Sequence, residues 1–213
     1  LKTSVEARPS VVNRARITAK KLSRDNRVKA KNIQRSIRRS LRRGHTLAAK
    51  RALKNLNAKR FLSNGQYDQL AARLGFAYFT DGLDKWALKW AVKAAERSGK
   101  LVPEAHWTAG LASWRLGKKD AAAYHFEHAA RSSSSATWFQ SAAAFWAARA
   151  NLVNQQPEKV NDWLKRASIY PRTFYGLLAR HILGKPVDFR WAPPPLHATN
   201  IKELSNQPRG KRG

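Results

Sequence analysis

His125 and His128 lie one helical turn apart, so that both imidazoles could bind one metal ion. A zinc site needs further ligands at a suitable spacing, and the sequence offers none beside them. Asp81 and Asp84 flank Gly82, but a calcium loop needs more carboxylates than this pair. We therefore expect no metal site, and we interpret the histidines as a solvated helix face and the aspartates as helix caps.

The sequence also lacks the motifs of familiar enzymes. It contains no G-x-S-x-G elbow, no phosphate-binding G-x-x-x-x-G-K-[ST] loop, no G-x-G-x-x-G turn and no H-E-x-x-H. Without cysteine there is no thiol nucleophile, disulfide or thiolate metal site. We assign no catalytic residue and no cofactor.

Lysine and arginine are the most abundant charged side chains in the sequence. The formal net charge is +29, and residues 1–60 carry +18 of it, because 20 basic residues there oppose only Glu6 and Asp25. Such a field favours polyanions such as nucleic acid, anionic lipid or an acidic cell-wall polymer, although a merely solvated basic surface would have the same composition. The candidates for polyanion binding are Lys20, Lys21, Arg35, Arg38, Arg39, Arg42 and Arg43.

Three segments of different composition carry these residues. Residues 1–30 are polar and basic with few large apolar side chains, and we expect an extended or loosely helical arm. In residues 31–184 apolar side chains recur at helical spacing, which predicts a purely α-helical body. Residues 185–213 begin with the proline-rich KPVDFRWAPPPL and are expected to be extended. No apolar run is long enough for a transmembrane segment.

Small residues recur in the helical body with spacings of 35 and 38 residues. The three sets, taken along the chain, are Gly75, Gly110 and Ala148; Ala87, Ala122 and Val160; and Ala94, Ala129 and Ala167. Small side chains at these positions would let paired helices approach closely, and the period is near the roughly 34 residues of a tetratricopeptide unit. We predict an all-α fold, a right-handed superhelical solenoid of tetratricopeptide-like helix pairs.

The last part of the body shows the pattern most clearly. An apolar helix over residues 142–153 is followed by a polar turn, and Pro157 suits the first turn of a second helix that ends near Ile169. A third helix over residues 174–183 ends at Gly184, which can adopt a left-handed cap conformation. Most tryptophans lie on such helices, and we expect them to fill the seams between pairs.

Four stretches in order resemble one protein family. They are VPEAHWTAGLASWRLGKKDAAAYHFE, SAAAFWAARANL, PRTFYGLLARHILG and VDFRWAPPPL. Together they resemble the helical region that precedes the catalytic domain in soluble lytic murein transglycosylases, especially those of alphaproteobacteria. The similarity covers residues 60–205, and the segment Phe174–Ala179 after a proline is its most specific part.

The resemblance implies a superhelical, often ring-closing α-domain in a periplasmic protein that cleaves peptidoglycan. The chain departs from that family where the chemistry resides, because no glutamate is followed by serine and the chain has no methionine for the family's Gly-Leu-Met-Gln segment. We therefore expect a non-catalytic region that binds or orients the anionic glycan strand for a C-terminal catalytic domain absent from this sequence. Arg149, Arg172 and Tyr175 are candidate glycan contacts, with helix-end packing as the alternative.

Two other functions fit the same sequence. The basic N-terminus would suit an RNA-binding or ribosome-associated helical-repeat protein, since phosphate contacts give affinity without a sequence code. A protein-interaction scaffold of the ordinary tetratricopeptide kind is the second alternative. The catalytic status of the full-length protein stays open.

Overall fold

The computed structural model describes residues 11–132 and 135–186, with side chains from residue 23 onward. Over these residues the chain forms ten α-helices and no β-strand, so the prediction of an all-α protein is confirmed. None of the described helices has the length and apolar character needed to cross a membrane. The Pro-rich stretch expected after residue 185 lies almost entirely outside the described residues.

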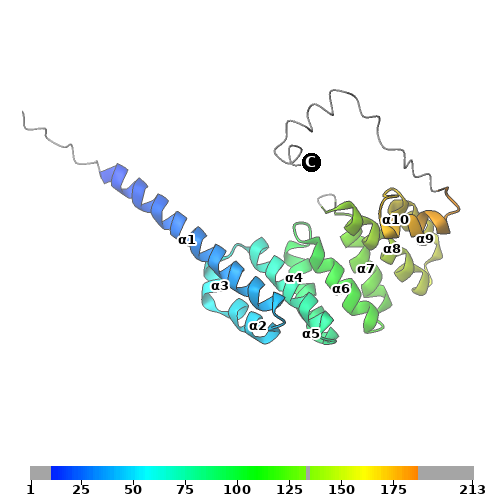
Figure 1. Ribbon diagram of the computed structural model, residues 1–213, viewed down its shortest axis with the longest axis horizontal. Coiled ribbons are helices and arrows are strands. Elements are labelled where there is room, and N and C mark those ends of the chain that lie inside the picture. The colour runs from blue at the N-terminus through cyan, green and yellow to red at the C-terminus, as the bar shows by residue number, and fades with distance from the viewer. Residues whose placement is uncertain (1–10, 133–134, 187–213) are drawn as a thin grey trace, which may run out of the picture.

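The first helix, α1 (Val11–Arg42), is the longest. Between Pro9 and Gly44 the sequence has neither proline nor glycine and is rich in the good helix formers arginine, lysine and alanine. The helix consequently runs without a break past residue 30, where we expected the arm to end and the repeats to begin. Its N-terminal half projects beyond the other helices (Figure 1).

Two short helices, α2 (Thr46–Lys54) and α3 (Leu56–Phe61), fold back against α1. Ile37 of α1 and Leu53 of α2 are fully buried in the core that they share with α4. This packing fixes the C-terminal half of α1 on the body of the protein.

Three helical hairpins follow in a row, in chain order (Figure 1). They are α4 (Asn64–Thr80) with α5 (Asp84–Ser98), α6 (Pro103–Arg115) with α7 (Lys119–Ala130), and α8 (Thr137–Val153) with α9 (Pro157–Ser168); a single helix, α10 (Phe174–Ile182), completes the row. Each helix from α4 to α9 packs against the next helix in the chain. Helix α10 packs against both α9 and α8. Pro157 is at the start of α9, and Gly184 has a φ of 64° after α10, as predicted.

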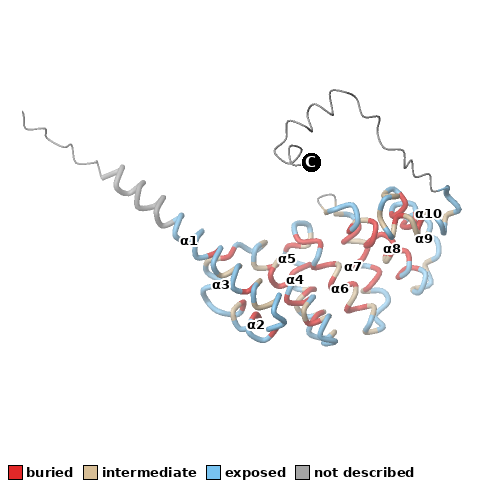
Figure 2. The backbone as a smooth tube through the Cα atoms, in the orientation of Figure 1, coloured by how far each residue is buried: buried red, intermediate tan, exposed pale blue. Residues whose placement is uncertain are grey.

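The small residues of the repeat lie where the helices meet. Ala94, Ala129 and Ala167 have no exposed surface, and buried residues alternate with exposed ones along every hairpin (Figure 2). At Gly110 a Cβ atom would lie 2.7 Å from the ring of Phe126, so α6 and α7 are too close there for a side chain. The recurrence of small residues thus has a steric cause.

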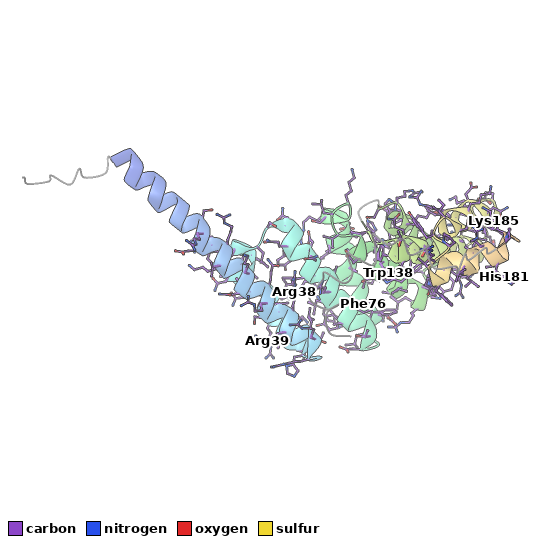
Figure 3. All side chains as sticks on the ribbon, turned by 45° about the horizontal axis from the view of Figure 1, so that its top comes forward. Arg38, Arg39, Phe76, Trp138, His181 and Lys185 are labelled. Atoms are coloured by element: carbon purple, nitrogen blue, oxygen red, sulfur yellow. The ribbon has the colours of Figure 1, made fainter. Side chains whose placement is uncertain are left out.

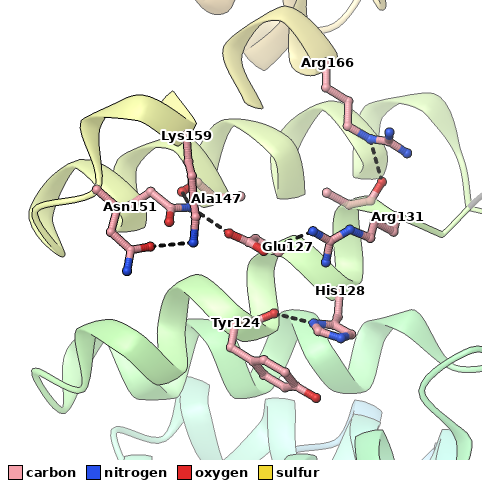
Figure 4. Close-up of polar contacts among 10 residues, drawn as sticks. Tyr124, Glu127, His128, Arg131, Ala147, Asn151, Lys159 and Arg166 are labelled. Carbon is pink, nitrogen blue, oxygen red and sulfur yellow. Dashed lines mark hydrogen bonds and ion pairs between the residues drawn. The ribbon is translucent and has the colours of Figure 1, made fainter. Parts of the chain in front are cut away.

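Polar contacts close the seam between α7, α8 and α9. Glu127 accepts a hydrogen bond of 2.9 Å from Asn151 Nδ2 and forms an ion pair of 3.2 Å with Arg131 (Figure 4). The Nε of Arg166 donates to the carbonyl of Ala130 over 3.2 Å. The bonds of Asn151 and Arg166 cross between helices, so they fix how the hairpins are aligned.

The spacing between first helices is uneven. Helix α4 packs closely on α6, and α8 packs on α10. Between α6 and α8, aromatic side chains fill the space instead: Trp107 lies 5.8 Å from Phe139, and Trp114 lies 5.5 Å from Trp146, measured between ring centroids. The wider separation of α6 and α8 borders the groove described next.

Candidate binding groove

A groove of about 710 Å³ is bounded by the first helices of successive units. Its walls come from α1, α4, α6 and the start of α8, with Leu101 and Ser135 contributed by the connecting segments. Three arginines line it, namely Arg38, Arg42 and Arg73, together with four aromatic residues, Phe76, Trp107, Trp138 and Phe139. Arginine beside aromatic rings is a combination that suits a ligand with both anionic groups and flat apolar faces.

The arginines differ in how firmly they are held. Arg38 is half-buried, and its guanidinium donates to Gln34 Oε1 over 3.2 Å and to Gln69 Oε1 over 3.1 Å. Arg42 and Arg73 are exposed, and neither belongs to an ion pair among the described residues. Among the described residues Glu104 is the one acidic residue that lines the groove, so the groove carries a net positive charge.

Two of the four aromatic residues of the groove, Phe76 and Trp138, are exposed. Trp138 is 61% exposed and Phe76 is 44% exposed, so Trp138 is not among the tryptophans that fill seams. Trp107 is half-buried because its ring lies 5.5 Å from that of Phe126 in the core. Figure 3 shows Arg38, Phe76 and Trp138 along the row of helices, apart from His181 and Lys185 at its end. Trp138 and Phe76 are therefore available to stack on a ligand.

The structure separates the predicted polyanion-binding residues into three sets. Arg38 and Arg42 line the groove. Arg35, Arg39 and Arg43 are exposed on α1 but do not line it. Lys20 and Lys21 belong to α1, and their side chains lie outside the described residues.

Arg149 and Tyr175, two of the candidate glycan contacts, meet at Trp146. The guanidinium carbon of Arg149 lies 4.7 Å from the centroid of Trp146, and the indole Nε1 of that residue donates to Tyr175 Oη over 3.2 Å. Arg172 is exposed, and among the described residues it makes no contact with this cluster. The cluster joins α8 to α10 and does not line the groove.

Arg73, Phe76 and Trp138 were not singled out from the sequence as a set. A usable signal does exist for α4, because Arg73, Phe76 and Thr80 recur at spacings of three and four on a helix whose other face is buried. Trp138 gives no such signal, since its exposure depends on how α8 sits against α6.

The histidines do not form the solvated face that we expected. His125 is 7% exposed, and its Nδ1 lies 3.0 Å from Nδ1 of the equally buried His106 on α6. Burial lowers the pKa of both imidazoles to about 4, with a smaller contribution from the charge of His128. No group of three or more potential ligands in the described part of the chain is arranged to hold a metal ion.

The two aspartates lie at helix ends, Asp81 as the C-cap residue of α4 and Asp84 in the first turn of α5, and both have side-chain partners. Asp81 follows the last residue of α4 and its Oδ2 accepts a hydrogen bond of 2.9 Å from Thr46 Oγ1. Asp84 begins α5 and is paired with Arg115. Asp81 therefore caps α4 through its backbone N–H, whereas the N-cap of α5 is Leu83, which makes no side-chain capping bond.

Comparison with known proteins adds no relative. No protein-family model matches the chain, and no curated protein matches it.

Proposed function

We propose that this chain is a non-catalytic binding region whose groove holds an anionic glycan strand, with peptidoglycan as the ligand. The observation that carries the proposal is the convergence of Arg38, Arg42 and Arg73 with the exposed rings of Phe76 and Trp138 in one groove.

This composition matches the chemistry of peptidoglycan. Carboxylates on the lactyl groups and peptide stems would pair with the guanidinium groups, which favour bidentate contacts with carboxylates. The apolar faces of the sugar rings would stack on Phe76 and Trp138. A groove lined by residues of four helices suits a strand rather than a small molecule.

The resemblance of residues 60–205 to lytic transglycosylases supports the same ligand. On this proposal the row of hairpins is a right-handed superhelix of tetratricopeptide-like units that works in the periplasm. It presents the strand to a catalytic domain elsewhere in the protein. Glycoside cleavage requires positioned carboxylates, and Glu104 is alone in the groove.

Co-sedimentation of the full chain with purified peptidoglycan sacculi over a salt series tests the proposal. The informative variants are Trp138→Ala, which removes an exposed ring, and Arg42→Glu/Arg73→Glu, which reverses two groove charges. The matched control is Arg24→Glu/Arg51→Glu, because these arginines are also exposed but do not line the groove.

We expect the groove pair to weaken binding at least about tenfold and the control pair to have a much smaller effect, since distant charges are screened by salt. Trp138→Ala should weaken binding without changing its salt dependence, because stacking is not ionic. Equal losses for the two arginine pairs, or sacculi that never bind, would contradict the proposal.

RNA is a second candidate ligand, favoured by the exposed arginines of α1 outside the groove. Arg35, Arg39 and Arg43 can reach phosphates without involving Phe76 or Trp138. Binding of a single-stranded RNA, reduced by reversing these three arginines and unaffected by Trp138→Ala, would favour this function over the glycan. Absence of RNA binding at low salt would exclude it.

A further inference from the structure

A second groove, of about 620 Å³, lies on α5 and the turn between α6 and α7. It shares no residue with the first groove. Its polar side chains are almost all lysines, and its apolar side chains are aliphatic. The lining consists of Lys85, Lys89, Lys93, Lys118, Leu88, Val92, Leu116 and Glu96. We call it the lysine groove.

The sequence of α5 arranges these residues in two parallel rows. Lys85, Lys89 and Lys93 recur every four residues and therefore share one side of the helix, over about 12 Å of its length. Leu88 and Val92 form an adjacent row at the same spacing. Lys118, from the neighbouring hairpin, lies across from them. The result is an aliphatic floor with positive charge on both sides.

The charge on these rims is not neutralised by the protein. No ion pair involving Lys85, Lys89, Lys93 or Lys118 occurs among the described residues, and all four side chains are exposed. Within the described part of the chain, Glu96 is the single acidic residue that lines the groove. Positive potential therefore remains available to a ligand.

An exposed tryptophan lies in the first turn of α5. Trp86 is 42% exposed, and the Nζ atoms of Lys50 and Lys89 lie 4.3 Å and 5.2 Å from the centroid of its ring. Exposed tryptophan is enriched at sites where one protein anchors another.

We propose that the lysine groove is a docking surface for an acidic amphipathic helix of a partner protein. The apolar side chains of such a helix would cover Leu88, Val92 and Leu116, and its flanking carboxylates would meet the lysines. An anionic membrane fits less well, because those three aliphatic residues are half-buried beneath the exposed lysines and do not protrude.

A defined probe tests this surface with the full chain. It is a fluorescein-labelled helical peptide with leucine at i, i+3, i+4 and i+7 and glutamate at the flanking positions. The comparison peptide has the same composition in an order that removes the amphipathic face. Fluorescence anisotropy at physiological salt measures both, since a strongly basic protein binds any acidic peptide at low salt.

The variant Lys85→Glu/Lys89→Glu/Lys93→Glu reverses one rim, and Lys31→Glu/Lys54→Glu/Lys59→Glu makes the same charge change at exposed lysines elsewhere. We expect the first variant to bind the amphipathic peptide at least about tenfold more weakly than the parent protein, and the second less than about threefold more weakly. Val92→Ser should lower the affinity for the amphipathic peptide several-fold and leave the affinity for the comparison peptide unchanged. If the glutamate variant lowers the melting temperature, the corresponding glutamine variant replaces it.

Three results would overturn the proposal. One is binding of the comparison peptide within about twofold of the amphipathic peptide, which would indicate charge alone. Another is an equal loss of affinity for the amphipathic peptide in the two triple variants. The third is lysine-dependent binding to phosphatidylglycerol vesicles with no binding of the amphipathic peptide, which would assign the surface to a membrane.

Discussion

The Nδ1 atoms of His106 and His125 face each other across 3.0 Å in the seam between α6 and α7. One of the two nitrogens must carry a proton and donate it, and the other must accept it, so when both rings are neutral they have different tautomers. A further proton on the accepting nitrogen would place two N–H groups face to face. Adjacent to the pair, Nε2 of His106 lies against Gly99, and the ring of His128 stacks on His106 at 5.0 Å.

This pair predicts that the protein loses stability in mild acid. Burial, with a smaller contribution from neighbouring histidine charge, lowers the pKa of both imidazoles to about 4 from 6.5. Between those values the unfolded chain binds more protons than the folded one, so the free energy of unfolding falls as pH decreases from about 6.5 to 4. We expect a loss on the order of 3 kcal/mol for each of the two imidazoles, measured by urea unfolding at a series of pH values.

The variant His106→Asn/His125→Asn isolates this effect from that of carboxylates. Its unfolding free energy should depend less on pH over the same window, whereas His181→Asn, a change at an exposed histidine, should behave like the parent protein. Parallel pH curves for the parent and the double variant would show that the pair does not titrate on unfolding.

Gly110→Leu should destabilise the hairpin of α6 and α7. The new Cβ would lie 2.7 Å from Phe126 Cδ1, and Phe126 has no exposed surface into which to move. We expect a cost on the order of 1–3 kcal/mol from overpacking. Thermal melting measures it, and Ala48→Leu on the exposed face of α2 is the control. Equal melting temperatures for these variants would mean that the close approach at Gly110 is absent.

Gln155 should be replaceable by glycine with a gain in stability. It has a φ of 57° in the turn before α9, where the equivalent turns have Gly82 at 76° and Gly117 at 71°. A side chain in the left-handed region costs about 1 kcal/mol or more, part of which returns as the greater entropy of unfolded glycine. We expect Gln155→Gly to raise the unfolding free energy by up to about 1 kcal/mol. The reverse change, Gly117→Gln, should lower the unfolding free energy. A loss of stability in Gln155→Gly together with a gain in Gly117→Gln would contradict the positive φ angles of these turns.

The helices of this protein could be predicted well from the sequence because their signals are local. Pro157 and Gly184 mark helix ends, and the recurring alanines mark buried positions. The start of α1 could not be predicted from the sequence, because a segment of good helix formers without large apolar residues is compatible with a helix or with a loose arm.

The groove and the histidine pair depend instead on contacts between distant residues. Arg38 meets Gln69 on α4, 31 residues away, and His106 meets His125, 19 residues away. Such contacts follow from how far one helix slides and rotates against the next, which periodicity does not specify. The sequence therefore identified Arg38 and Arg42 as basic residues but could not place them beside Trp138.

An ion pair with a buried carboxylate and an ion pair on the surface should respond differently to loss of the carboxylate. Asp68 has no exposed surface, and its carboxylate accepts hydrogen bonds from Arg97 Nε over 3.0 Å and from Ser98 Oγ over 2.6 Å. Asp68→Ala would leave the hydroxyl and part of the guanidinium without partners in the α4–α5 seam, and we expect a loss of about 3 kcal/mol in chemical denaturation. Asp162, paired with Lys165 over 3.6 Å and largely exposed, is the matched control, and Asp162→Ala should leave the unfolding free energy unchanged. If the two substitutions cost the same, the Asp68 network does not hold α4 and α5 together.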